Sequence, residues 1–512
     1  MSSLIPTIHE DLSSFSKGTI IEFASTPIHI ATSLEILANN PRIDWEYKYW
    51  GNSTLWKNGM NLEFLHYKNE FPEGLSNYLM RLNVQKGKFT TDMPFNINRV
   101  RSRISSLERL IQSCKKVSDL RVLDGEFGNV GAAVANAYAS IFNDKYTNIS
   151  WNIATIRKLV LSYLQVYEST VSLCERLEQT GVSRSKHVFI TYNGRFLHER
   201  AVRDACDALG FPIYFHETTR DRYFLRSEGF HDRIANQKLW LSHWQNSDQT
   251  FEEKYEIARN YYEGLEAKEN PFHTREKNLF NPRLRKPYVI FFTSNDDETL
   301  GFWDVWKEQL GNQLEVIDKL YSFFSTKEDI ELIIRIHPNT KNKPWQVRRI
   351  WSGIRSRRNV FVIDEESRIS SIELAKESLG VITFGSTIGL QSSFLKKPVC
   401  VLADCAYDLL DCVTKINDMG EFYDWCENLK MSKSFNKETW EDSLVRPYFV
   451  ATAGVRFKIF TISLADWNSW SPDPSTIESL YPSSLKVRRN RMGRRLKIAF
   501  LKMRHIFNFK LD

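Results

Sequence analysis

The chain has 512 residues, of which 42% are hydrophobic and 26% charged, and its formal net charge is +7. A chain of this length exceeds one hydrophobic core, so we expect at least two domains. No stretch approaches the roughly 18 apolar residues that a membrane span requires, and the N-terminus lacks the basic start and apolar core of a secretory signal. The seven cysteines form no CxxC pair, which favours buried, reduced thiols in a cytoplasmic protein.

The first half of the chain alternates strand-like and helix-like segments. The expected strands are at 18–25, 44–50 and 62–67, at the start of 119–142 and at both ends of 187–217, and the expected helices are at 73–84, 98–116 and 151–179. Such alternation is typical of βαβ units. We therefore expect a Rossmann-like domain over residues 1–267.

The second half repeats this pattern after a charged, proline-containing linker. The expected parts are the linker at 268–287, a second Rossmann-like domain at 288–445, a segment at 446–484 and a basic tail at 485–512. A long helix at 446–467 would run back toward the first domain. The predicted fold is α/β, with two Rossmann-like domains that face a cleft and a C-terminal helix that crosses back.

The motif RIHPN lies at the end of a predicted strand of the second domain. Arg335 and His337 share a face, because alternate side chains of a strand point the same way. Pro338 fixes the exit of the chain before Asn339. An imidazole here can donate to a phosphate or ribose oxygen, and a guanidinium can pair with an anion. A strand-end histidine that bonds only to the backbone is the alternative interpretation.

The motif FGSTIG follows a later strand of the same domain. Gly385 precedes Ser386 and Thr387, whose hydroxyls suit the cap position of the helix that follows. A helix N-terminus offers free N–H groups to a phosphate, although capping alone would also explain these residues. Since the carboxyl ends of parallel strands meet at one edge of a sheet, we expect both motifs to line one pocket for a phosphate-bearing ligand.

RIHPN followed by TFGSTIGLQSSFLKKPV resembles the donor domain of glycosyltransferases that make capsules and other surface polysaccharides. The similar families are the Kdo transferases of capsule assembly and, more distantly, bacterial polysialyltransferases and CDP-glycerol polymerases. FFTSNDDE with Gln313 resembles their opening donor strand, and weaker likeness extends to ITYNGRF, FPIYFHE and WLSHWQ. The fold that this implies is GT-B-like, an outline that periplasmic binding proteins and sugar-nucleotide epimerases share.

In those families the His-Pro pair and the Ser/Thr-rich turn hold the phosphate and ribose of a cytidine nucleotide donor. The resemblance implies a CMP-sugar donor, CMP-Kdo or a related acidic sugar, and a saccharide or lipid-linked acceptor of capsule or lipopolysaccharide synthesis in bacteria. We expect no cofactor and no metal, because no cluster of potential ligands has metal-site spacing. The implied donor-binding residues are Arg335, His337, Pro338, Asn339, Gly385, Ser386 and Thr387.

Sugar transfer would require a general base in the first domain to deprotonate an acceptor hydroxyl. Asp124 and Glu126 of DGEFG and Glu217 of FHET each follow a predicted strand, so position does not choose among these catalytic candidates. A solvated loop or a helix cap is the alternative for each acid. His29 also follows a strand and is a further candidate. With Asn193 and Arg195 of NGR, it forms the set expected to bind the acceptor.

Residues 485–512 carry ten Lys/Arg and one acid, a local charge of +9, so the rest of the chain sums to −2. Apolar residues recur there at helical spacing between Met492 and Ile506, with basic residues on the other face. A basic amphipathic helix suits an anionic membrane surface, and a disordered tail is the alternative. Nucleic acid is the rival partner of any basic run, but the slightly acidic body of the chain argues against it.

The sequence thus predicts a cytoplasmic glycosyltransferase that is peripheral at the inner membrane. Two other functions fit the same residues. One is a non-catalytic scaffold that binds nucleotide sugars, and the other is a sugar-nucleotide epimerase of the same fold.

Overall fold

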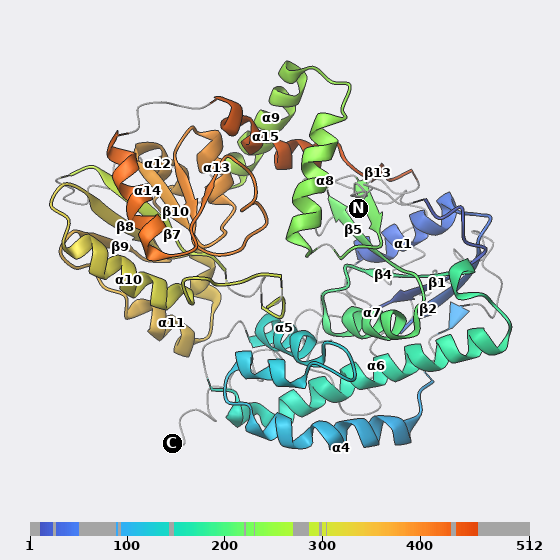
Figure 1. Ribbon diagram of the computed structural model, residues 1–512. Helices are drawn as coiled ribbons and strands as arrows, with labels where there is room; N and C mark the ends of the chain where they lie inside the picture. Colours follow the sequence, from blue (N-terminus) through green and yellow to red (C-terminus); the bar gives the residue numbers. More distant parts are fainter. Residues whose placement is uncertain are drawn as a thin grey trace, which may run out of the picture. The chain divides into compact units, whose positions relative to one another are not determined.

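The computed structural model describes residues 11–23, 27–50, 89–90, 94–142, 148–219, 222–229, 231–269, 286–295, 300–303, 305–431 and 437–458. The predicted strand at 62–67, the helix at 73–84, most of the linker and the basic tail lie outside these residues. The described chain forms two compact units (Figure 1). The seven-stranded unit comprises the described residues between 11 and 229 and those at 454–458, and the six-stranded unit comprises those between 231 and 453.

The sheet of the seven-stranded unit has the order β13-β6-β5-β4-β1-β2-β3, with β1 to β5 parallel and β6 and β13 antiparallel to their neighbours. The order reverses between β1 and β4, because β2 and β3 lie on one side of β1 and β4 lies on the other. Its strands are β1 (Lys17–Glu22), β2 (Asp44–Tyr49), β3 (Phe89–Thr90), β4 (His187–Tyr192), β5 (Ile213–Thr219), β6 (Arg222–Arg226) and β13 (Val455–Arg456).

Helix α6 is the central helix of this unit, and most of its middle is buried because α4, α5 and α7 pack around it (Figure 1). Its N-terminal neighbour α4 is capped by the Asn96 side chain, which accepts from the N–H groups of Asn98 and Arg99. The helices are α1 (Pro27–Asn39), α4 (Ile97–Ser113), α5 (Val130–Phe142), α6 (Ile153–Gln179) and α7 (Leu197–Leu209), with short 3₁₀ helices η1 (Val117–Leu123), η2 (Ser150–Asn152) and η3 (Arg184–Lys186).

The prediction of a strand at the start of 119–142 is wrong. The segment forms η1, and its buried residues are Val117, Leu120 and Leu123. A spacing of three residues places these side chains on one face of a 3₁₀ helix, whereas a half-buried strand would need a spacing of two.

The six-stranded sheet has the order β12-β11-β10-β7-β8-β9, and all its neighbours are parallel. The chain moves outward from β7 through β8 to β9 and then resumes on the other side of β7, so the order reverses between β7 and β10. This is the strand order of a doubly wound nucleotide-binding sheet. The strands are β7 (Tyr288–Phe292), β8 (Glu331–Arg335), β9 (Val360–Ile363), β10 (Gly380–Thr383), β11 (Val399–Val401) and β12 (Thr414–Lys415).

Each central strand of this sheet is short and apolar, and β7, β8 and β10 are buried along their whole length. Strands that helices cover on both faces have this character. The helices are α8 (Arg233–Gln245), α9 (Phe251–Glu269), α10 (Gln313–Ser325), α11 (Trp345–Ser352), α12 (Ser371–Glu377), α13 (Ile388–Phe394), α14 (Met419–Met431) and α15 (Lys437–Thr452), and η6 (Pro338–Asn342) is a 3₁₀ helix.

The two units divide at residues 230/231, whereas the sequence analysis placed α8 and α9 in the first domain. Both helices pack on α15, and α15 packs on α13 of the same unit. The Tyr262 hydroxyl on α9 donates to the Ser443 carbonyl of α15 at 2.7 Å. Tyr262 and Ser443 are 181 residues apart in the sequence, so composition near the linker gave no sign of this packing and the boundary was misplaced.

The helix predicted at 446–467 begins earlier, at Lys437, and ends at Thr452. Gly454 then adopts a φ of +86°, and a Cβ there would lie 2.6 Å from the Tyr223 carbonyl oxygen. Only glycine fits this turn without strain. The chain then joins the sheet of the seven-stranded unit as β13, so the return segment is a strand within the described residues. Two Rossmann-like α/β units in one chain confirm the predicted GT-B-like fold class.

Candidate functional site

Strands β7, β8 and β10 are neighbours, and their carboxyl ends carry the motifs that the sequence analysis selected. Ser294 follows β7, His337 follows β8, and Ser386 follows β10. Adjacent strands lie about 5 Å apart, so the outer two ends are separated by roughly 10 Å. Ligands of such sheets bind where the strand order reverses, which here is between β7 and β10. The structure therefore brings the two predicted motifs to one edge.

His337 is half-buried and held in a defined orientation. The Nδ1 atom of its ring accepts from the Asn339 N–H at 3.1 Å, and its backbone N–H donates to the Thr293 hydroxyl at 2.9 Å. Because Nδ1 is an acceptor, the neutral imidazole carries its proton on Nε2. The donor nitrogen of the ring is therefore Nε2. Pro338 opens the 3₁₀ helix η6, and the Asn339 side chain is exposed beyond it.

Ser294 belongs to the motif FFTSNDDE and follows β7, where the strand order reverses. It was not among the predicted site residues. Gln313 fixes its backbone by accepting from the Ser294 N–H at 2.7 Å and donating to the Ser294 carbonyl at 3.0 Å. The Ser294 hydroxyl has no hydrogen-bond partner among the described residues. A buried hydroxyl without a partner is costly and therefore suggests a ligand atom.

The hydroxyls of two neighbouring side chains fix the backbone of the turn Gly385–Ser386–Thr387. The Thr383 hydroxyl accepts from the N–H groups of Gly385 and Ser386 at 3.3 and 2.9 Å, and the Tyr407 hydroxyl donates to the Ser386 carbonyl. Gly385 has a φ of +108°, and a Cβ there would meet the Cβ of Cys405 at 2.7 Å. Glycine is therefore required at this position.

The expected side-chain cap at this turn does not form. Thr387 occupies the cap position of α13, but its hydroxyl makes no capping hydrogen bond, because its backbone is already helical at φ −58° and ψ −22°. A cap residue normally needs an extended backbone for its side chain to reach the next N–H groups. The Thr387 side chain is exposed, and that of Ser386 is half-buried.

Arg335 has a structural role instead of the anion-binding role that we expected. Its side chain is only 1% exposed, and its guanidinium donates to the backbone carbonyls of Asp364 and, at 2.8 Å, of Ser367. Burial lowers the pKa of Arg335 to about 10. These bonds hold the loop that follows β9, so we exclude Arg335 from the candidate donor site.

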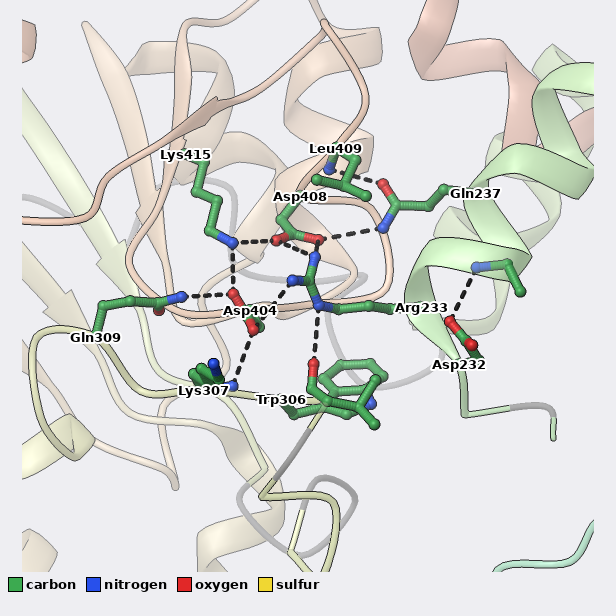
Figure 2. Close-up of polar contacts among 12 residues, drawn as sticks. Asp232, Arg233, Gln237, Trp306, Lys307, Gln309, Asp404, Asp408, Leu409 and Lys415 are labelled. Atoms are coloured by element: carbon green, nitrogen blue, oxygen red, sulfur yellow. Dashed lines mark hydrogen bonds and ion pairs between the residues drawn. The ribbon is translucent and has the colours of Figure 1, made fainter. Parts of the chain in front are cut away.

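The six-stranded unit contains a buried ion cluster that was not predicted from the sequence (Figure 2). Arg233 of α8 donates to both carboxylate oxygens of Asp408 at 2.8 and 2.7 Å and lies 3.1 Å from Asp404. Lys415 of β12 contacts both acids. The two acids are four residues apart in the loop after β11, and this loop also contains Tyr407, which supports the Ser386 turn. The motif DCAYD has two acids directly after an apolar strand, and this was the signal from which the cluster could have been predicted.

In the seven-stranded unit the candidate base Glu217 lies on β5, next to the end of β4. It accepts from the Asn193 side chain and from the Thr218 N–H at 3.1 Å. Burial raises the pKa of Glu217, and the bonds from Thr218 and Asn193 act in the opposite direction. Burial and then the neighbouring Glu217 carboxylate raise the pKa of Tyr192 well above its ordinary value. A partly desolvated carboxylate of this kind suits proton abstraction.

Asn193 and Gly194 form the sharp turn that places these groups, with φ values of +50° and +74°. Asparagine tolerates this left-handed region better than most residues. The predicted acceptor residue Arg195 comes next. Its guanidinium lies 4.5 Å from the Phe196 ring centroid, and its Nε has no hydrogen-bond partner among the described residues.

His29 stacks on Tyr192 with ring centroids 3.4 Å apart, and burial followed by the neighbouring His216 lowers the pKa of His29 well below its ordinary value. Behind it, Ser33 donates to Glu22 at 2.6 Å, and His216 Nε2 lies 3.7 Å from the same carboxylate. Glu22 and His216 are fully buried. Neither residue was predicted, because their contact joins two strands that lie far apart in the sequence.

Asp124 and Glu126 do not share this environment. The Asp124 carboxylate accepts from the Ala132 N–H at 3.0 Å in the first turn of α5, which is the capping role named as its alternative. Glu126 is exposed. Asp204 of α7 accepts from the Asn129 N–H at 2.7 Å and so fixes the turn after Glu126. The capping contact of Asp124 and the exposure of Glu126 therefore set both acids apart from Glu217.

No protein-family model matches the chain, and no curated protein matches it. Among solved structures, the β-Kdo 2,4 transferase KpsC of Thermosulfurimonas dismutans is 13% identical, with 57% of this chain and 86% of that chain covered and a TM-score of 0.33. The UDP-GlcNAc 2-epimerase of Methanocaldococcus jannaschii is 13% identical, with 84% and 98% covered and a TM-score of 0.28. The N-terminal domain of Candida albicans trehalose-6-phosphate phosphatase is 10% identical, with 88% and 96% covered and a TM-score of 0.32. Values at this level assign none of these activities to the chain.

Within the described residues, no helix has both the length and the apolar character needed to cross a bilayer. In the same part of the chain, no three His, Cys, Asp or Glu side chains form a group that could hold a metal ion. Metal independence stays a prediction.

Proposed function

We propose that the chain is a metal-independent glycosyltransferase of bacterial surface polysaccharide synthesis. It would use a cytidine-activated sugar, CMP-Kdo or a related acidic sugar, and transfer it to a saccharide or lipid-linked acceptor. The observation that carries the proposal is the gathering of His337, Ser294 and Ser386 at the reversal point of a nucleotide-binding type of sheet.

In this proposal the donor phosphate accepts from the Nε2–H of His337 and from the hydroxyls of Ser294 and Ser386. These donors are neutral, so the site would hold the nucleotide by hydrogen bonds and release it readily after transfer. Asn339 and Thr387 are exposed at the rim of the same edge and would contact the ribose or the sugar. The preference for cytidine rests on the resemblance of the RIHPN and TFGST motifs alone.

The proposed base is Glu217. An acceptor hydroxyl would transfer its proton to the Glu217 carboxylate while its oxygen bonds to the anomeric carbon of the donor. The bond between that carbon and the phosphate oxygen breaks, and CMP leaves with the electron pair. Asn193 would orient the base, and Arg195 and His29 would contact the acceptor. The basic tail at 485–512 would bring the enzyme to the cytoplasmic face of the inner membrane.

Two measurements test this proposal. The melting temperature is recorded with CMP, CDP and UDP, and CMP release from CMP-Kdo is followed with and without a saccharide acceptor in the presence of EDTA. We expect stabilisation by cytidine nucleotides and acceptor-dependent release of CMP. Stabilisation by UDP alone would remove the cytidine assignment, and conversion of UDP-GlcNAc to its 2-epimer would favour the epimerase. Binding of CMP-Kdo without turnover would indicate a scaffold.

A further inference from the structure

Residues 341–358 form the second concentration of positive charge in this chain. They contain seven Lys/Arg and no acid, a local charge of +7 that equals the net charge of the whole protein. With this segment and residues 485–512 set aside, the remaining residues carry a net charge of −9. We propose that this segment is a docking surface for an anionic lipid bilayer. Its exposed cations, here called the α11 basic surface, are Lys341, Arg348, Arg349, Arg355, Arg357 and Arg358.

The cations of this surface are not neutralised by neighbours. None of the six side chains forms an ion pair or a hydrogen bond with another residue in the part of the chain that the structure describes. Other arginines differ, since Arg103 pairs with Glu168 and Arg157 with Glu108. The neighbouring helix α10 contributes an acid, Asp318, which lies one turn before Tyr321. The α11 basic surface therefore presents net positive charge to solvent.

The turn that carries three of the cations is well anchored. Arg357 and Val360 exchange backbone hydrogen bonds at 2.8 and 3.0 Å, and the Ser356 hydroxyl accepts from the Val362 N–H at 2.9 Å. The Tyr321 hydroxyl donates to the Arg355 carbonyl at 2.5 Å, and the Arg357 guanidinium lies 4.4 Å from the Tyr321 ring centroid. A preorganised surface loses less conformational entropy on binding than a mobile one.

The position of the surface suits a bilayer. Helix α11 leads away from the carboxyl end of β8, and the turn at 353–358 precedes β9, so its cations lie at the edge of the sheet opposite His337. Figure 1 shows α11 beside α10 at the outside of this unit. Docking through Arg355, Arg357 and Arg358 leaves the donor edge free, whereas Lys341 lies in η6, four residues after His337.

Partly exposed apolar side chains separate the cations. Ile350 lies between Arg349 and the helix end, and Ile354 precedes Arg355. Exposed cations interleaved with apolar side chains are typical of binding to anionic headgroups. A nucleic acid or an acidic polysaccharide would instead be expected to follow a groove of fixed donors, and this alternative is an outcome of the test.

The test uses the full chain and vesicles of phosphatidylcholine with or without phosphatidylglycerol, at low and high salt. The variant R355Q/R357Q/R358Q removes three charges from the surface. Its matched control, R101Q/R109Q/K115Q, removes three exposed charges that lie on or directly after α4. Since each cation near an anionic surface is worth a several-fold change in partitioning, we expect the first variant to bind at least about tenfold more weakly. The control should stay within about twofold of the unmodified chain.

A second readout reports on α11 even if the tail dominates binding. Ser352 is exposed, and the native cysteines of the described residues are buried or, at Cys412, half-buried, so S352C can be labelled selectively with an environment-sensitive dye. The dye should shift to the blue on phosphatidylglycerol vesicles and be quenched by a lipid-borne quencher. A dye on S105C of α4 should not respond.

Equal responses from both dyes, or equal vesicle binding by both charge variants, would overturn the proposal. Loss of binding to RNA or to an acidic polysaccharide in R355Q/R357Q/R358Q, with vesicle binding unchanged, would assign the surface to a polymer and also overturn it. Neither readout depends on transferase activity.

Discussion

The seven-stranded unit buries Glu22 at the end of β1 and His216 on β5, and it half-buries Glu217 next to His216. These groups lie near the point where its strand order reverses. The six-stranded unit places half-buried, neutral hydrogen-bond donors at its own reversal point, namely His337 and Ser386. Two sets of buried charges in this unit, the Arg233 cluster and Arg335, hold loops in place.

This difference separates two chemical tasks. Burial shifts pKa values and prepares a group for proton transfer, as at Glu217. Neutral donors on well-held turns can bind a phosphate without changing protonation. In the proposed function the seven-stranded unit carries out proton transfer and the six-stranded unit binds the nucleotide, and each of the following predictions tests this division.

The largest effect is expected from E217Q. A general base contributes about 10²- to 10⁴-fold to turnover, so kcat should fall by that factor. Because the folded-state pKa of Glu217 is raised, its ionisation costs stability as pH rises through that pKa. The glutamine removes this cost, so the melting temperature at pH 7 should be equal or higher. A variant with full activity, or one that unfolds, would return Glu217 to a structural role.

The next largest effect is on folding. R233M leaves Lys415 as the one cation that contacts the buried carboxylates of Asp404 and Asp408 among the described residues. Removal of one partner from a buried ion pair costs about 3–5 kcal/mol, and urea denaturation should show this loss. The control R259M breaks exposed pairs with Glu256 and Glu263 and should cost much less, because water screens them. Equal losses in both variants would mean that the cluster does not stabilise the six-stranded unit.

For the donor site, H337A should weaken binding of CMP-Kdo by about 1.5–3 kcal/mol, the worth of a hydrogen bond to a charged group. Isothermal titration measures this change. H337Q keeps an N–H donor near the position of Nε2 and should recover part of the affinity. S386A should lose less, because other donors remain at the same edge. If H337Q were as weak as H337A, donation from Nε2 would not be the basis of binding.

Acidification should weaken the seven-stranded unit first. Burial lowers the pKa of His187 to about 4 and that of His198 to about 3, from an ordinary value of 6.5. The unfolded chain then binds more protons, so stability is lost as pH falls below 6.5, by roughly 1 kcal/mol per histidine for each pH unit. Hydrogen exchange should show earlier opening of β4 and α7 than of β7 and β8 near pH 5. Simultaneous opening of both units would contradict the comparison.

The smallest effect is expected from N193G. Glycine keeps the positive φ of this turn but removes the side-chain donor to Glu217, which acts to lower the pKa of that acid. The acidic limb of the pH profile of kcat/KM should therefore move upward, by less than about one pH unit. An unchanged profile with an unchanged fold would show that Asn193 does not tune the base.

Much of the fold could be predicted from the sequence, because β7, β8 and β10 are short apolar runs that end in glycine or polar residues. The motifs at His337 and Ser386 were found for the same reason. Other features depend on distant packing. Arg335 and Thr387 have the residue types of a phosphate site, but only the tertiary structure shows that the Arg335 guanidinium binds carbonyls and that the Thr387 backbone prevents capping.

The buried groups of the seven-stranded unit illustrate the same limit. Glu22 and Ser33 lie on different elements, and His216 reaches them from a third, so no local pattern links the three residues. The predicted domain boundary was wrong for a similar reason, because α8 and α9 contact α15 about 200 residues later in the chain. Composition marks a linker, whereas long-range packing defines a unit.

The most direct test of the division of tasks is a paired kinetic measurement of CMP-Kdo turnover with unmodified protein, H337A and E217Q. The dissociation constant of the donor is determined for each protein, and kcat is determined at saturating donor and acceptor. We expect H337A to weaken donor binding by about tenfold or more, and E217Q to lower kcat by at least about a hundredfold with donor binding unchanged. The reverse pattern, or loss of donor binding in E217Q, would contradict the account.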